Sequence, residues 1–335
     1  MSDPSAEGRF ERRRVLGEGG MGVVHVAFDR ERGAEVALKT LTRLDPNSLG
    51  ALKNEFRALA DLTHENLVAL YELVSEDGAW FLSMEIIDGV SFLAHVRDGL
   101  APRPAQADQS TVEVQSSRMI PVTMRSPLPP GAASSTSSTS STSSPSPRLV
   151  QPACNVEVLR RALRQLALGV AAIHGAGQVH RDLKPSNVLV TTAGRVVILD
   201  FGLATVQKGR RAAPVSGPRL IIGTPEYMAP EQALGEAAGP ASDCYAIGMM
   251  LFEALTGQLP FVGDTRQILL AKRWSESRAP AELAAGIPED LAQLCVECLR
   301  RAPAQRPTIG EILRRLDGEP PRVFSADPVA PPSSH

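Results

Sequence analysis

Two short motifs constrain this chain more than any other feature, because they place four reactive groups close together. Residues 180–187 read His-Arg-Asp-Leu-Lys-Pro-Ser-Asn, and a second motif, Asp-Phe-Gly, begins at Asp200. Asp182 can accept a proton from a hydroxyl group, and Lys184 can neutralise a phosphoryl group during transfer. Asn187 and Asp200 carry the hard oxygen ligands that Mg²⁺ prefers. A fold that uses these groups together must bring them to one site, and they suit phosphoryl transfer.

Length, charge and cysteine content exclude several other classes of protein. At 335 residues, 43% of them hydrophobic, the chain can bury a sizeable core. Its net charge of −2 gives no electrostatic reason to expect nucleic acid as a partner. Residues 1–14 are polar and charged, unlike a secretory signal, and no apolar run reaches the roughly 18 residues of a membrane helix. The four scattered cysteines do not suggest a disulfide framework, so we expect a cytoplasmic protein without a membrane span.

Cys295 and Cys298 form one Cys-x-x-Cys pair, which has two interpretations. The pair could be half of a zinc site or a redox couple. Alternatively, both cysteines are small apolar residues on the inner face of a helix that also carries Leu291 and Leu294. The second interpretation is favoured, because the sequence has no second such pair and no paired histidines nearby.

The first third of the chain has the pattern of a small sheet that carries one helix. Strand-like alternation or apolar runs occur at residues 22–28, 35–41, 67–74 and 80–87. Between them, residues 48–62 repeat apolar side chains at the helical period.

The later part of the chain is mostly helical in pattern. Helices are predicted at residues 155–175, 242–256, 289–300 and 308–316. The segment 242–256 is apolar almost all round, which is typical of a buried helix.

Residues 99–153 interrupt this order with a stretch that has almost no periodicity. Within it, residues 134–146 are nearly all serine and threonine, a composition that cannot offset its ordering entropy by burial. We expect a disordered surface insertion, either a tolerated spacer or a docking or autophosphorylation segment. Residues 319–335 contain five prolines and have the composition of a linker.

Gly17, Gly19 and Gly22 form a Gly-x-Gly-x-x-Gly pattern, which allows the backbone to approach phosphates closely. Dinucleotide-binding folds use the same spacing, but there the third glycine opens a helix. Here it opens the strand-like segment 22–28, and no ribose-binding acid follows in a βαβ unit. The pattern therefore favours a glycine-rich hairpin that covers a nucleotide.

Lys39 ends the next apolar strand, and its charge suits the α- and β-phosphates of a nucleotide. A carboxylate is needed to hold it in place, and Glu55 on the helix 48–62 is the best candidate. Glu65 is an alternative, but it falls in the turn after that helix.

Taken together, these motifs resemble those of the eukaryotic-type (Hanks-type) Ser/Thr protein kinases, in particular the bacterial branch. The resemblance covers residues 9–318 apart from the insertion. It implies an α+β bilobal fold, with a small, mainly antiparallel β N-lobe and one key helix at about 9–84. A hinge at about 85–90 and a larger α-helical C-lobe at about 91–318 would follow, with ATP bound between the lobes.

The same resemblance implies a role for each matching residue. Asp182 is the catalytic base, Lys184 stabilises the transferred phosphoryl group, and Asn187 and Asp200 bind Mg²⁺, for which Mn²⁺ is an alternative. Lys39 contacts the phosphates and pairs with Glu55. The implied ATP-binding residues are Leu16, Gly17, Gly19, Gly22, Val24, Ala37, Lys39, Glu55, the gatekeeper Met84, the hinge residues Glu85 and Ile87, and Leu189.

Residues 223–231 resemble the end of a protein-kinase activation segment, which docks the peptide. The resemblance implies that Glu231 pairs with Arg306 and that Asp243 caps the backbone of the catalytic loop. Small-molecule phosphotransferases of related fold lack this segment. Lys184 together with Thr224 matches the Ser/Thr-specific pattern, so ATP-dependent phosphorylation of protein Ser/Thr hydroxyls is the predicted function.

Regulation and partners are less constrained by the sequence. Arg181 before the catalytic Asp suggests activation by phosphorylation, with Thr205 or Ser216 as acceptor, although a merely basic loop is the alternative. Self-association for autophosphorylation and fusion to further C-terminal domains are compatible with the insertion and the tail. A pseudokinase scaffold is disfavoured, because Lys39 and all the catalytic and metal positions are present.

Overall fold

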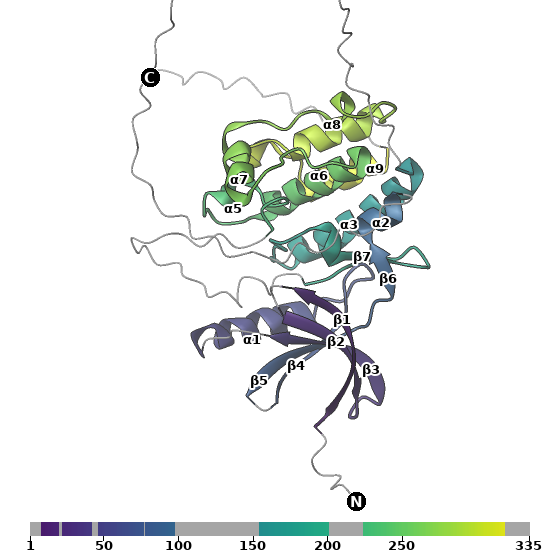
Figure 1. The fold of residues 1–335 in the computed structure, drawn as a ribbon, viewed down its shortest axis with the longest axis vertical. Helices are drawn as coiled ribbons and strands as arrows, with labels where there is room; N and C mark the ends of the chain where they lie inside the picture. The colour runs from purple at the N-terminus through teal and green to yellow at the C-terminus, as the bar shows by residue number, and fades with distance from the viewer. Residues whose placement is uncertain are drawn as a thin grey trace, which may run out of the picture.

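The computed structural model describes residues 8–19, 22–41, 46–76, 78–97, 154–200 and 224–318. They form two lobes, a mainly purple sheet with one helix and a group of helices coloured from blue and teal to green and yellow (Figure 1). The predicted α+β bilobal architecture is confirmed.

The N-lobe is an antiparallel sheet of five strands in the order β1-β2-β3-β5-β4. Its helix α1 contacts β4 and lies beside the sheet in Figure 1. The bounds are β1 Phe10–Gly19, β2 Gly22–Asp29, β3 Ala34–Leu41, α1 Pro46–Ala60, β4 Leu70–Glu76 and β5 Ala79–Met84.

Alternate residues of β3 face opposite sides of the sheet, as the two-residue period of a strand requires. Val36 and Leu38 pack in a small outer cluster with Phe10, Ala27 and Phe81. Residues 37 and 41 belong instead to the main core, which continues into the C-lobe. The side chain at position 39 therefore lies on the face that the two lobes share.

The C-lobe combines a three-stranded sheet, in the order β6-β7-β8, with a group of helices. Its strands are β6 Gly89–Ser91, β7 Val188–Thr191 and β8 Val196–Ile198. Its α-helices are α2 Phe92–Val96, α3 Val156–Gly175, α5 Pro230–Ala233, α6 Pro240–Thr256, α7 Thr265–Trp274, α8 Glu289–Cys298 and α9 Ile309–Leu316. Short 3-10 turns are η2 Pro185–Asn187, η3 Pro280–Glu282 and η4 Pro303–Gln305.

Helix α6 is the centre of the C-lobe, and every residue from Ser242 to Thr256 is buried. This confirms the prediction from its all-round apolar pattern. Gly248 allows α8 to approach, since a Cβ at that position would lie 2.6 Å from the Cβ of Cys298. Both cysteines of the Cys-x-x-Cys pair are buried in this packing, as expected of apolar core residues.

One strand is shorter than the sequence pattern suggests, for a clear reason. The apolar run 67–74 enters β4 only at Leu70, because residues 66–68 hydrogen-bond to β8 instead. Val68 N donates to Ile198 O at 3.0 Å, and Ile198 N donates to Asn66 O at 2.9 Å. These bonds join the two lobes.

The predicted insertion 99–153 and the tail 319–335 lie outside the described residues. The chain nevertheless leaves and re-enters the C-lobe at one point. Arg97 and Cys154 form an antiparallel bridge, and Asn155 N donates to Val96 O at 3.0 Å. An insertion between these residues does not separate α2 from α3.

Candidate active site

Asp243 of the buried helix α6 fixes the loop that carries the His-Arg-Asp motif. The Asp243 carboxylate accepts hydrogen bonds from His180 N at 2.8 Å and from Arg181 N at 2.9 Å. It also contacts His174 Nε2 at 2.9 Å. These contacts confirm that Asp243 caps this backbone. They hold Arg181 at a φ of 71°, in the left-handed region that a non-glycine residue occupies only when its surroundings impose it.

Asp182 lies where three groups of different character meet. Lys184 Nζ and Asn187 Nδ2 both lie 3.3 Å from Asp182 Oδ2. On the other side, Thr224 N donates to Asp182 Oδ1 at 3.3 Å, and Lys184 Nζ donates to Thr224 Oγ1 at 2.7 Å. The Asp182 side chain is only 7% exposed. A carboxylate that is predicted to act as the base therefore lies next to a cation and next to the segment expected to receive a peptide.

Asn187 and Asp200 are brought together by the β7–β8 hairpin, which pairs Val188 with Ile198. The next backbone bond, from Leu199 N to Asn187 O at 2.8 Å, continues this pairing toward Asp200. The amide nitrogen of Asn187 is used on Asp182, so its oxygen remains for a ligand. One amide and one carboxylate suit Mg²⁺, which takes its other ligands from phosphates and water.

Lys39 and Glu55 have other ion-pair partners in this structure, and the predicted pair between them stays a prediction. Lys39 Nζ lies 2.7 Å from Asp200 Oδ2, and Arg181 Nη1 lies 3.5 Å from Glu55 Oε1. Burial alone would raise the pKa of Asp200, but the charge and hydrogen bond of Lys39 hold it below its ordinary value. Asp200 also has a positive φ of 55°. Compared with the predicted pairing, Lys39 contacts Asp200, and Glu55 contacts Arg181.

The predicted ATP-binding residues of the N-lobe share the inner face of the sheet. The strand register places Val24 opposite Lys39 and Ala37 opposite Met84. In the glycine-rich hairpin, Gly22 has a φ of 126°, and a Cβ there would lie 2.0 Å from Thr40 O. The structure places the remaining predicted residues as follows: Leu16, Gly17 and Gly19 at the end of β1, Glu85 and Ile87 after β5, and Leu189 in β7.

Glu85 is tied into the structure more tightly than the sequence indicates. Its N–H donates to Ala69 O at 2.9 Å, so a bound base could use only its carbonyl oxygen. Its carboxylate pairs with Arg195 from the β7–β8 turn at 2.7 Å, and Arg195 Nε donates to Glu65 O at 2.7 Å. Burial alone would raise the pKa of Glu85, but the hydrogen bonds from Arg195 and from Ala69 N, together with the charge of Arg195, lower it. Arg195 thus joins the connection between the lobes to the loop after α1.

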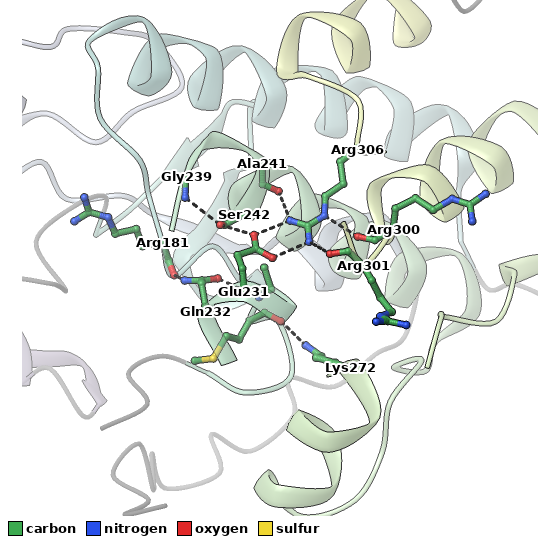
Figure 2. Close-up of polar contacts among 12 residues, drawn as sticks. Arg181, Glu231, Gln232, Gly239, Ala241, Ser242, Lys272, Arg300, Arg301 and Arg306 are labelled. Atoms are coloured by element: carbon green, nitrogen blue, oxygen red, sulfur yellow. Dashed lines mark hydrogen bonds and ion pairs between the residues drawn. The ribbon is translucent and has the colours of Figure 1, made fainter. Parts of the chain in front are cut away.

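The segment after Thr224 is held by a buried ion pair, shown in Figure 2. Arg306 donates to both carboxylate oxygens of Glu231 at 2.7 Å. Its other N–H groups donate to the carbonyls of Ala241, Arg300 and Arg301 at 2.7–2.9 Å, which satisfies the whole guanidinium. The predicted contact between Glu231 and Arg306 is confirmed. Burial opposes ionisation of Glu231, but the hydrogen bonds from Arg306 and Ser242 and the charge of Arg306 together lower its pKa.

Two residues of this region were missed by sequence reasoning. Gln232 links the segment to the catalytic loop, because its Nε2 donates to Arg181 O at 3.0 Å. Lys272 of α7 donates to three carbonyls of the segment. The sequence could have indicated that Lys272 is buried, because it lies four residues after Ile268 and therefore on the same face of the helix.

The fold and the site define a protein kinase. Residues 10–316 match the family described as protein tyrosine and serine/threonine kinase, and the chain belongs to that family. The resemblance found in its motifs is thereby confirmed. Beyond the site, no helix in the described part of the chain is long and apolar enough to cross a membrane.

Bacterial serine/threonine-protein kinases are among the similar proteins. PknA of Mycobacterium tuberculosis (strain ATCC 25177 / H37Ra) is 30% identical over 307 residues, which covers 89% of this chain and 58% of that protein. PksC of Streptomyces coelicolor is 31% identical, covering 98% of this chain and 51% of that protein. PrkC of Bacillus subtilis is 26% identical, covering 96% and 41% respectively. The chain thus spans about half the length of these relatives.

Proposed function

We propose that this chain transfers the γ-phosphoryl group of ATP to serine and threonine hydroxyls of proteins. The observation that carries the proposal is the set of contacts around Asp182. Its carboxylate lies 3.3 Å from Lys184 Nζ and 3.3 Å from the backbone nitrogen of Thr224. A base, a cation and the beginning of a peptide-docking segment therefore meet at one side chain.

Each group then has a defined task. Asp182 accepts the proton of the acceptor hydroxyl, and Lys184 stabilises the negative charge that develops on the transferred group. Asn187 and Asp200 would hold Mg²⁺, or Mn²⁺, which neutralises the phosphates of bound ATP. For this, Asp200 must exchange its contact with Lys39 for the metal, which releases Lys39 for the phosphates and for Glu55.

The acceptor is proposed to be a protein rather than a small molecule. Support comes from residues 224–231, which lie beside Asp182 and are braced by the buried Arg306. The chain's own hydroxyl-rich residues 134–146 are candidate sites of autophosphorylation, which could require self-association. Thr205 and Ser216 are further candidates and lie outside the described residues. The need for ATP and the buried thiols of Cys244, Cys295 and Cys298 favour a cytoplasmic location.

The proposal is tested with the whole chain, labelled ATP, Mg²⁺ and a generic protein substrate. Asp182→Asn keeps the shape of the side chain but removes the base, so transfer should fall about 100- to 10,000-fold. Nucleotide binding, measured by calorimetry, should be nearly unchanged. Asp61→Asn is the matched control, because Asp61 is an exposed acid in the turn after α1.

The possible outcomes separate the alternatives. Phosphoserine and phosphothreonine in the product, lost in Asp182→Asn and kept in Asp61→Asn, would support the proposal. Nucleotide binding by the wild-type chain without any transfer would indicate a scaffold instead. Unchanged turnover in Asp182→Asn would overturn the assignment of the base.

A further inference from the structure

Helix α7 carries a lysine on its apolar face, which is an unusual place for a charge. Lys272 is completely buried, at 0% exposure, beside Ile268 at 3% and Leu269 at 9%. Burial lowers its pKa well below the ordinary value for lysine. A buried ammonium group is costly unless every N–H finds a partner, so its contacts indicate what it does.

All three N–H donors of Lys272 are used on one short stretch of backbone. They bond to the carbonyl oxygens of Pro225 at 2.9 Å, Glu226 at 2.6 Å and Met228 at 2.8 Å. Only the charged form of lysine offers three donors, so these acceptors favour the ammonium group. Its nitrogen also lies 5.3 Å from the ring centroid of Tyr245, within reach of a cation–π contact. Figure 2 shows Lys272 approaching the segment from α7, on a different side from Arg306.

The stretch that Lys272 binds is directly coupled to the catalytic groups. Thr224 precedes it, and Thr224 O accepts from Tyr227 N at 3.1 Å and from Met228 N at 3.2 Å. On its other side, Thr224 contacts Lys184 and Asp182. A shift of the backbone at residues 225–228 would therefore move Thr224 relative to the catalytic base.

We propose that Lys272 is a positioning residue. Its ammonium group fixes the backbone of residues 225–228 in the conformation that binds the substrate peptide. This inference rests on the proposed protein-kinase function. Lys272 does not touch the reacting atoms, and it acts through the segment that it holds. Its effect should therefore depend on the acceptor, being large for a peptide and small for water.

The test compares Lys272→Met, which keeps the length of the side chain but has no donors, with the wild-type whole chain. We expect kcat/KM for a peptide substrate to fall about 10- to 100-fold, mainly through a higher KM, because the backbone of residues 225–228 is displaced. The slow hydrolysis of ATP by water and the Kd for ATP should stay within about twofold. Arg273→Met is the matched control, since its side chain is the exposed neighbour on the same helix.

A second variant covers the case in which Lys272→Met does not fold. Lys272→Gln retains two of the three N–H donors, so its loss should be intermediate. Hydrogen exchange of the amides in residues 226–229 should be faster in either variant, while exchange in α6 stays slow. This measurement does not require activity.

The outcomes distinguish the inference from the function on which it rests. An inactive wild-type chain would overturn the proposed function, and hydrogen exchange would still decide whether Lys272 orders the segment. The inference is overturned if folded Lys272→Met phosphorylates the peptide as well as Arg273→Met does. It is also overturned if peptide transfer and ATP hydrolysis fall together, or if exchange at residues 226–229 is unchanged.

Discussion

The charged groups on the two sides of the catalytic loop (residues 180–187) differ in how they are paired. We call residues 224–231 with Arg306 the docking side, and Lys39, Glu55 and Asp200 the nucleotide side. On the docking side, the side chains of Arg306 and Glu231 are 0% and 7% exposed and make a two-pronged contact. On the nucleotide side, Lys39 binds Asp200, a predicted metal ligand, and Glu55 lies 3.5 Å from Arg181, whose side chain is 32% exposed. The docking side is assembled for its proposed task, whereas the nucleotide side must exchange partners first.

This difference indicates where control is exerted. A buried, fully hydrogen-bonded pair changes only at a large cost in free energy, so it is suited to a fixed part. The contact between Arg181 and Glu55 is longer and partly exposed, so it is weaker, and a phosphate or a bound nucleotide can redirect it. We therefore expect substitutions on the docking side to lower stability, and those on the nucleotide side to lower activity.

The largest expected effect comes from Arg306→Met. This change leaves the Glu231 carboxylate buried without its partner, together with the carbonyls that Arg306 binds. The free energy of unfolding should fall by about 3–5 kcal/mol, measured by urea denaturation. Arg301→Met alters an exposed side chain nearby and should change it by less than about 0.5 kcal/mol. Equal stability of the two variants would remove the contrast between the two sides.

A smaller effect is expected from Glu55→Gln on the nucleotide side. If Glu55 must leave Arg181 to hold Lys39 in the active arrangement, kcat should fall about 100-fold. The free energy of unfolding should change by less than about 1 kcal/mol, because the present pair is long and partly exposed. Glu65→Gln is the control, since Glu65 was the alternative partner and is exposed. Full activity of Glu55→Gln, or an equal loss in Glu65→Gln, would contradict the exchange.

The sequence predicted the docking side better than the nucleotide side, and the reason is physical. The contact between Glu231 and Arg306 joins α5 to the end of η4, and Ser242 of the buried helix α6 hydrogen-bonds to the same carboxylate. The contact between Lys39 and Glu55 depends on the conformation of the chain, and a sequence lists the groups without saying which partners they hold. The same limit applies to Asp200, whose residue type indicates a metal ligand although it now binds Lys39.

Three other features could not be predicted from the periodicity and motifs of the sequence. Helix α7 is ten residues long, and the lysine on its apolar face weakens the very periodicity that would reveal it. Arg195 lies in a turn, where no repeat marks a residue that reaches back to Glu85 and Glu65. The bridge between Arg97 and Cys154 joins positions on either side of a long insertion, and only the fold brings them together.

The smallest expected effect is the contribution of the docking pair to acid sensitivity. The pKa of Glu231 is lower in the folded chain than its ordinary value, because burial is outweighed by the hydrogen bonds from Arg306 and Ser242 together with the charge of Arg306. This contribution is fully present above the ordinary glutamate pKa of about 4.3 and is lost as the pH falls toward the folded pKa. Across that window the free energy of unfolding should decline by up to about 1.4 kcal/mol per pH unit from this group. Glu231→Gln cannot titrate, so its decline below pH about 4.3 should be shallower in urea titrations at several pH values. Glu236→Gln alters an exposed acid nearby and should keep the wild-type slope of the free energy of unfolding against pH. Identical slopes in the wild-type chain and both variants would show that the pair of Glu231 and Arg306 does not contribute to acid sensitivity.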